Sequence, residues 1–260
     1  MSSYNTTWIS TVTGTGTTWT FSIVRELLSH TTLNVLPEKV YQTTERYLKI
    51  YEDEAQFDFN SNNHYILQGH AALELDLIQK RSKVISCLRN PYDNCASHYE
   101  FMKCDLETAI KNALHIPLLI KHYAKLDRDK FLLLRYEAID ENPVGLIQSI
   151  SDFLGVQINK ENAENLAQKY SRENVRKIIA NNERSLVDKL LAGETVLKEE
   201  VCIDGDDVRS FDTKTGYQSR QISDRKTGEW RSAFSEPQIL RIIEALDEVA
   251  RILGYKSEKL

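Results

Sequence analysis

Short apolar runs rich in β-branched residues alternate along the chain with longer amphipathic stretches. The runs that predict β-strands are Trp8–Val12, Tyr65–Gln68, Lys83–Leu88 and Phe131–Arg135. The stretches that predict helices are Thr17–Leu28, Leu73–Gln79, a helix from Pro91, Pro143–Leu154, Lys160–Ala180 and Ser235–Leu253. This alternation predicts an α/β fold, a single domain over residues 1–260 with a central parallel sheet flanked by helices.

Two segments refine this picture. Phe131–Arg135 is apolar almost throughout, which is typical of a parallel strand covered on both faces. Gly193–Gly228 shows no periodicity and carries many loop residues. Loops of that length are uncommon in compact domains and tend to be functional or mobile, so we expect a mobile lid or acceptor-binding segment around 185–228.

Composition and charge exclude several classes of function. The chain is 41% hydrophobic and 27% charged, and its 33 basic and 38 acidic residues give a net charge of −5, which disfavours nucleic acid as a partner. No apolar run approaches the roughly 20 residues of a membrane span, and no secretory signal begins the chain. Four cysteines without zinc-site spacing predict no metal and a reducing cytoplasm. Nothing in the sequence indicates a homo-oligomer.

A glycine- and threonine-rich loop joins the first predicted strand to the first predicted helix. Its candidate ligand-binding residues are Gly14, Thr15, Gly16, Thr17, Thr18 and Trp19. Backbone amides at a helix N-terminus favour an anion, the glycines allow close approach, and the threonine hydroxyls add donors. Neither the triphosphate-binding loop nor the dinucleotide fingerprint fits, because Thr17 and Trp19 stand where those motifs need Lys and Gly. A turn without a ligand is the alternative.

A second candidate phosphate site follows the strand Lys83–Leu88. Arg89 leaves the carboxyl end of that strand, where open α/β sheets bind ligands. Its guanidinium suits bidentate contact with a phosphate, and Ser97, in the helix that begins at Pro91, adds a hydroxyl. The alternative is an arginine at a strand end that caps a turn.

Together these motifs resemble the PAPS-dependent sulfotransferases, where PAPS is 3′-phosphoadenosine 5′-phosphosulfate. Residues 16–19 match the G-T-T-W of the family's P-K-S-G-T-T-W loop, and residues 89–99 match its R-N-P-x-D-x-x-x-S-x-Y motif. The resemblance implies a P-loop-like nucleotide-binding fold, PAPS as sulfuryl donor and PAP as product. It places the 5′-phosphosulfate on the loop, the adenine on Trp19, and the 3′-phosphate on Arg89 and Ser97. Thr13 and Gly14 replace the family's Pro and Lys, and that Lys assists departure of the phosphate leaving group.

Looser matches extend the resemblance from Trp8 to Arg231. Tyr136 stands in a Y-E pair whose tyrosine reaches the adenine in the family. Residues 225–231 resemble a C-terminal segment that folds over the 3′-phosphate, here two residues shorter. The contact with that phosphate is expected from Arg225, Lys226 and Thr227, with Arg220 as an alternative. Ser171 is a weak match to a hydroxyl near the adenine.

The family usually places a catalytic histidine shortly before the R-N-P strand, and His70 holds that place here. His64 is its nearest competitor but precedes the strand Tyr65–Gln68. Nothing in the motifs names the acceptor. Seven acidic and two basic residues between 194 and 212, and six acids against three bases between 38 and 58, favour a cationic small molecule. Solvated loops without a role in binding are the alternative explanation of these acids.

The resulting hypothesis is a cytoplasmic enzyme that sulfates a hydroxyl or amine of a small molecule, such as an amine- or guanidine-bearing alkaloid. Because Gly14 replaces the loop Lys, a PAP- or PAPS-binding protein with little or no catalysis is one alternative. A small nucleotide kinase is another, disfavoured by the absent G-K-[ST] element.

Overall fold

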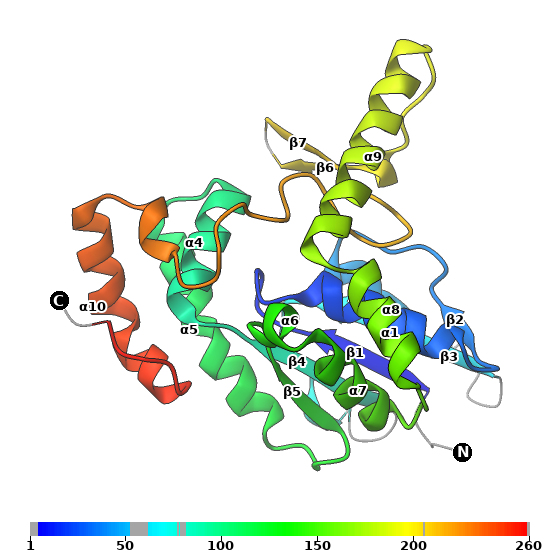
Figure 1. Cartoon of the computed structure of the whole chain (residues 1–260), viewed down its shortest axis with the longest axis horizontal. Helices are drawn as coiled ribbons and strands as arrows, with labels where there is room; N and C mark the ends of the chain where they lie inside the picture. Colours follow the sequence, from blue (N-terminus) through cyan, green and yellow to red (C-terminus); the bar gives the residue numbers. More distant parts are fainter. Residues whose placement is uncertain (1–4, 53–61, 77, 79–81, 205, 259–260) are drawn as a thin grey trace. The chain divides into compact units, whose positions relative to one another are not determined.

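The structure, a computed structural model, describes residues 5–52, 62–76, 78, 82–204 and 206–258 (Figure 1). A five-stranded sheet has the order β2-β3-β1-β4-β5. Its strands are β1 (Thr6–Ser10), β2 (Asn34–Leu36), β3 (Asn63–Gly69), β4 (Ser82–Leu88) and β5 (Phe131–Arg135). β2 pairs in parallel with β3, and β4 in parallel with β5, with Val84 opposite Phe131. The predicted α/β fold with a parallel sheet and flanking helices is confirmed.

One expectation about the sheet is wrong. β5 was expected to be covered on both faces, but it is the last strand in the sheet order, and Leu134 is its one buried residue. Leu133 is 37% exposed. Continuous apolarity cannot separate a central strand from an edge strand whose side chains are partly covered.

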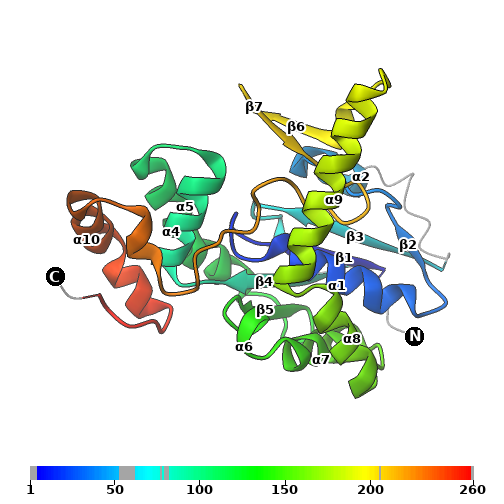
Figure 2. The same cartoon turned by 45° about the horizontal axis from the view of Figure 1, so that its top comes forward.

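Within this fold the chain forms two compact units, each built from separate segments. Unit 1 comprises Met1–Thr7, Thr18–Gly69 and Pro143–Ile222. Its helices are α1 (Thr17–Ser29, less its first residue), α2 (Thr44–Glu52), α7 (Pro143–Leu154), α8 (Lys160–Lys169) and α9 (Arg172–Leu191). A 3₁₀ turn, η2 (Lys198–Glu200), leads into an antiparallel hairpin of β6 (Val201–Asp204) and β7 (Asp207–Ser210). This hairpin lies beside α9 in both views (Figures 1 and 2).

The hairpin corrects the expectation of an unstructured stretch over Gly193–Gly228. Ile203 and Val208 face each other across its two strands, and the two residues between the strands, Gly205-Asp206, have a sequence typical of a two-residue hairpin turn. Residues 185–191 of the expected lid belong to α9. The helix predicted over Lys160–Ala180 is two helices, because Ser171 caps a new one by accepting a hydrogen bond from Asn174 N–H.

Unit 2 comprises Trp8–Thr17, His70–Asn142 and Ser223–Leu260. Besides β4 and β5 it contains α4 (Pro91–Met102), α5 (Leu106–Tyr123), α6 (Ala138–Glu141), η3 (Trp230–Ala233) and α10 (Glu236–Ile252). α4, α5 and α10 pack around one apolar core, in which Trp230 stacks on Tyr92 with ring centroids 5.0 Å apart. The predicted helix Leu73–Gln79 includes positions outside the described residues. No helix in the described ranges is long and apolar enough to cross a membrane.

Candidate active site

Four of the strands are followed directly by a candidate functional residue. The loop 11–16 follows β1, His70 follows β3, Arg89 follows β4, and Tyr136 follows β5. The carboxyl ends of parallel strands share one edge of a sheet, which is where open α/β sheets bind ligands. The loop, His70, Arg89 and Tyr136 all belong to unit 2.

The loop after β1 is held by its own hydroxyls. Thr15 Oγ1 donates to the carbonyl of Val12 at 2.7 Å, and the hydroxyls of Thr11 and Thr17 bond to each other. The hydroxyls of Thr15 and Thr17, two of the three expected to contact a phosphate, therefore already have partners within residues 11–17. The backbone amides at the start of α1 are the donors that the loop offers to an anion.

Both loop glycines have positive φ, and both are closely approached. Gly14 has φ +84° and Gly16 φ +95°. A Cβ at Gly14 would lie 3.2 Å from Asn94 Nδ2 and 3.6 Å from Ser97 Oγ, and one at Gly16 would lie 3.2 Å from Tyr136 Cδ2. The loop therefore runs directly along the start of α4, and a side chain at position 14 would disturb that approach.

An amide pair that the sequence did not single out fixes the loop. Asn94 Nδ2 and Asn112 Nδ2 both donate to the carbonyl of Thr13, at 2.8 and 3.0 Å, and Asn112 also donates to Asn94 Oδ1. Asn94 lies in the R-N-P motif, but Asn112 is on α5, and no local pattern pairs it with Thr13.

Arg89, the residue directly after β4, contacts this loop. Its Nη1 donates to the carbonyl of Gly14 at 2.8 Å, and its guanidinium lies over the ring of Tyr136, 4.0 Å from the centroid. Although the residue is 8% exposed, its Nε–H is buried without a hydrogen-bond partner. An unused charged donor beside a glycine-rich loop fits a site for an anionic group, as a phosphate would require.

His70 is held in one tautomer. Its Nδ1 lies 2.9 Å from the carbonyl of Thr11, and because a carbonyl can only accept, Nδ1 carries the proton. In the neutral ring Nε2 is then the basic nitrogen. The side chain is exposed, yet surrounding protein desolvates it and lowers its pKa, against a smaller opposing effect of the Thr11 carbonyl. At neutral pH His70 can therefore accept a proton.

His98, the residue after Ser97, is a second imidazole that interacts with His70. Desolvation, with a smaller contribution from the charge of His70, lowers the pKa of His98 to about 4, so it is neutral at physiological pH. Its Nδ1 is buried without a hydrogen-bond partner. The predicted competitor His64 lies instead in β3 of unit 1, 2.9 Å from Thr7 Oγ1.

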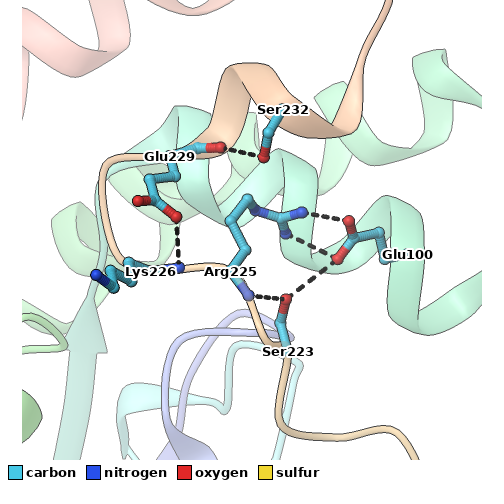
Figure 3. Close-up of polar contacts among 6 residues, drawn as sticks. All are labelled: Glu100, Ser223, Arg225, Lys226, Glu229 and Ser232. Carbon is cyan, nitrogen blue, oxygen red and sulfur yellow. Dashed lines mark hydrogen bonds and ion pairs between the residues drawn. The ribbon is translucent and has the colours of Figure 1, made fainter.

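The C-terminal segment expected to bind a phosphate is attached to α4. Arg225 forms a two-pronged ion pair with Glu100, and Lys226 extends from the other side of the segment (Figure 3). Gly228 N–H donates to Asp93 at 2.8 Å, while burial raises the pKa of that carboxyl. Thr227 Oγ1 is buried without a partner. Of the three predicted residues, Arg225 is thus already engaged by a carboxylate.

The remaining predicted residues belong to unit 1. Thr18 Oγ1 accepts a hydrogen bond from Gln221 at 2.7 Å, and Trp19 is buried in α1. Arg220 pairs with Asp207, and Ser171 serves as the cap of α9. Across the described residues, no three His, Cys, Asp or Glu side chains gather in a way that could hold a metal ion.

A comparison with models of protein families identifies one family. The sequence model described as "Sulfotransferase domain" matches residues 5–254. No curated protein sequence gives a match. Among solved structures, retinol dehydratase in complex with androsterone and inactive cofactor PAP is similar, with a TM-score of 0.60 and 14% identity over 98% of this chain and 82% of that one. Mouse sulfotransferase SULT7A1 complexed with PAP has a TM-score of 0.58 and 14% identity, covering 96% of this chain and 86% of that one.

Proposed function

Because the chain belongs to the sulfotransferase family, we propose that it transfers the sulfuryl group of PAPS to a hydroxyl or amine of a small-molecule acceptor. One observation above all supports PAPS as the sulfuryl donor. Arg89, tied to the carbonyl of Gly14, keeps a buried guanidinium N–H without a partner beside the glycine-rich loop that leads into α1. That arrangement suits a ligand that carries phosphate groups.

In this proposal His70 is the general base. The Thr11 carbonyl holds Nδ1 protonated, so Nε2 removes the proton from the acceptor oxygen or nitrogen. That atom forms a bond to sulfur, while the bond between sulfur and the 5′-phosphate oxygen breaks and its electron pair leaves with the phosphate of PAP. The loop amides and Arg89 stabilise the negative charge that grows on this phosphate.

For the acceptor we propose a cationic small molecule with an apolar part. In unit 1, Glu199 pairs with Lys39, Glu200 with Lys189, and Asp207 with Arg220, so part of the acidic segment 194–212 is already neutralised. Its remaining acids include three that form no ion pair with any residue of the described ranges: Glu194, Asp206 and Asp212. On the hairpin of the same unit, Ile203 and Val208 are 68% and 62% exposed. Of these acids Glu194 and Asp206 are exposed, and together with the exposed apolar side chains they favour an amine- or guanidine-bearing alkaloid.

The test of this function is incubation of the purified protein with PAPS and a panel of amines, guanidines and neutral phenols, with PAP release as the readout. We expect turnover with at least one class and fastest turnover with a cationic acceptor. Binding of PAP without turnover on the whole panel would support a binding protein, and magnesium-dependent consumption of ATP would support a kinase. A neutral phenol that turns over fastest would contradict the cationic acceptor.

The role of His70 is tested by His70→Ala. Loss of a general base should lower kcat by about 10²–10⁴-fold while PAP affinity, measured by calorimetry, changes little. The wild-type pH profile carries a second check. Because the pKa of His70 is lowered, its proton-accepting form persists below the ordinary value of 6.5, so the acid limb of kcat/KM should lie below that pH. Equal turnover in His70→Ala and wild type would remove His70 from the mechanism.

A further inference from the structure

The segment that follows His70 is held by hydrogen bonds from two elements of unit 2. β1 ends at Ser10, whose hydroxyl donates to the carbonyl of Ala71 at 3.1 Å. α5 ends at Tyr123, whose hydroxyl accepts a hydrogen bond from the backbone N–H of Leu73 at 3.0 Å. The partners are 61 and 50 residues apart in sequence, so tertiary packing brings them together.

These bonds form one directed chain through two buried hydroxyls. Tyr123 Oη lies 2.8 Å from Ser10 Oγ, and both residues are 0% exposed. Ser10 Oγ is the nearer donor to the Ala71 carbonyl, which lies 3.5 Å from Tyr123 Oη. Because Ser10 gives its proton to that carbonyl, Tyr123 donates to Ser10 and accepts from Leu73. Each hydroxyl therefore donates once and accepts once, and the bonds of such a chain strengthen one another.

A further contact from α5 fixes the same backbone. His122 Nε2 lies 2.7 Å from the carbonyl of Leu73, and because a carbonyl can only accept, Nε2 carries the proton. Leu73, which is 6% exposed, thus has both of its backbone polar groups bonded to consecutive residues of α5. The Tyr123 ring packs against the rings of His122 and Phe131, with centroids 5.0 and 5.9 Å apart. The packed end of α5 is therefore an attachment point for the segment Ala71–Leu73.

The end of β1 also holds the imidazole of His70. Thr11, the residue after Ser10, accepts the hydrogen bond from His70 Nδ1 at 2.9 Å. Two successive residues thus fix the His70 ring and the backbone of Ala71. Because the side chain of His70 is exposed, a fixed backbone limits the ring rotation that would break the contact with Thr11.

We propose that Tyr123 is a positioning residue for His70, which fixes the segment Ala71–Leu73 and so keeps Nδ1 on the Thr11 carbonyl and Nε2 as the basic nitrogen. The inference rests on the proposed function, in which His70 is the general base. Tyr123 itself takes no part in proton transfer to the acceptor, because its hydroxyl is buried and donates to Ser10, and burial raises its pKa.

The first test is Tyr123→Phe, which removes the hydroxyl and keeps the ring. We expect kcat to fall by about tenfold, less than in His70→Ala, while PAP affinity stays within about twofold of wild type. The second readout is nitrogen-15 NMR of the histidine rings at about pH 8, where His70 is neutral. The His70 signal, assigned by its loss in His70→Ala, should show Nδ1 protonated in wild type and a mixture of both tautomers in Tyr123→Phe.

Two further variants show whether the effect belongs to this chain of hydrogen bonds. Ser10→Ala interrupts the chain at its next link, so the double variant S10A/Y123F should lose no more kcat than the worse single variant. Tyr92→Phe is the matched control, because it removes another buried hydroxyl of unit 2, which donates to Asp247 at 3.0 Å. It should keep the wild-type kcat and the wild-type His70 signal.

An unchanged His70 signal in Tyr123→Phe would overturn the inference whatever the kcat of this variant, and so would a mixed signal with wild-type kcat. A wild-type protein that turns over no acceptor would refute the proposed function itself. The NMR comparison would then still decide whether Tyr123 positions His70.

Discussion

At the scale of single residues, position 14 decides how the loop differs from that of its family. Gly14 has φ +84°, and the place of its absent Cβ lies 3.2 Å from the amide that holds Thr13. Restoring a lysine by Gly14→Lys should therefore damage the loop and fail to raise turnover. The backbone at position 14 approaches α4 too closely to leave room for a side chain. The cation beside this position is Arg89, whose Nη1 donates to the Gly14 carbonyl.

This conclusion is tested with Gly14→Ala. We expect it to lower the free energy of unfolding by about 1–3 kcal/mol, measured with denaturant, because it combines a left-handed φ with crowding against Asn94. Gly155→Ala is the matched control, because Gly155 has φ +73° and nothing within 4 Å of its Cβ position. A loss no larger in Gly14→Ala than in Gly155→Ala would show that the crowding has no effect.

His98 predicts a pH-dependent stability. Its pKa in the folded protein is about 4, against an ordinary value of 6.5, so between these values the unfolded chain binds a proton that the folded one does not. The contribution of neutral His98 to the free energy of unfolding is fully present above pH 6.5. It is lost as the pH falls towards 4, by at most about 3 kcal/mol. His98→Gln should flatten this part of the curve of melting temperature against pH. His115→Gln, an exposed histidine on α5, should leave the curve as in wild type.

At the scale of elements, α4 and α5 hold in place segments of the site that are distant from them in sequence. α4 supplies Asn94 to the loop and two carboxylates to the C-terminal segment, while α5 supplies Asn112. The R-N-P motif predicted the position of α4 because Pro91 and the Asn90 cap are local signals. The contact between Asn112 of α5 and Thr13 was not predictable, because it depends on tertiary packing and leaves no periodic pattern in the sequence.

The tether from α5 is tested with Asn112→Leu. This change removes two hydrogen bonds and leaves the Thr13 carbonyl with Asn94 alone, which should cost about 1 kcal/mol and weaken PAP binding roughly fivefold. Lys111→Ala, an exposed neighbour on the same helix, should bind PAP as wild type does. PAP affinity equal to wild type in Asn112→Leu would show that the tether does not order the loop.

Three segments show which features of these elements could not be predicted from the sequence. β5 was predicted with its correct bounds, but its place at the sheet edge follows from the strand order, which its apolar run does not encode. The hairpin β6–β7 was missed because four-residue strands give too little periodicity, although Gly205-Asp206 is a sequence typical of a two-residue hairpin turn. Arg225 was predicted as a phosphate ligand, and only the structure shows its counter-ion Glu100, 125 residues away in sequence.

At the scale of the whole molecule, the distribution of the net charge of −5 bears on how the protein would attract the proposed cationic acceptor. Ion pairs neutralise part of the acidic segment in unit 1, while acids such as Glu194, Asp206 and Asp212 are left without such a pair among the described residues. Interactions between a cationic acceptor and exposed acids are screened by salt, whose Debye length is about 10 Å at 0.1 M. The KM for a cationic acceptor should therefore rise with ionic strength, and that for a neutral phenol should not.

Neutralising these acids tests the same point without salt. The double variant E194Q/D206N, at the two exposed acids, should raise the KM for a cationic acceptor about 3–10-fold and reduce its salt dependence. The control E161Q/E248Q makes the same change in net charge at exposed positions on α8 and α10 and should leave the KM unchanged. An equal rise in both variants would mean that overall charge, rather than the acidic segment, attracts the acceptor.

The division of unit 2 into three stretches of chain has a consequence for biosynthesis. The loop after β1 is made first, α4 follows, and the segment that α4 clamps through Asp93 and Glu100 is made last, with Trp230 and α10. Such distant pairings raise the contact order and slow folding. A growing chain on the ribosome therefore exposes the apolar face of α4 until residues 223–260 emerge, and this interval is when the nascent protein is most open to aggregation or chaperone capture.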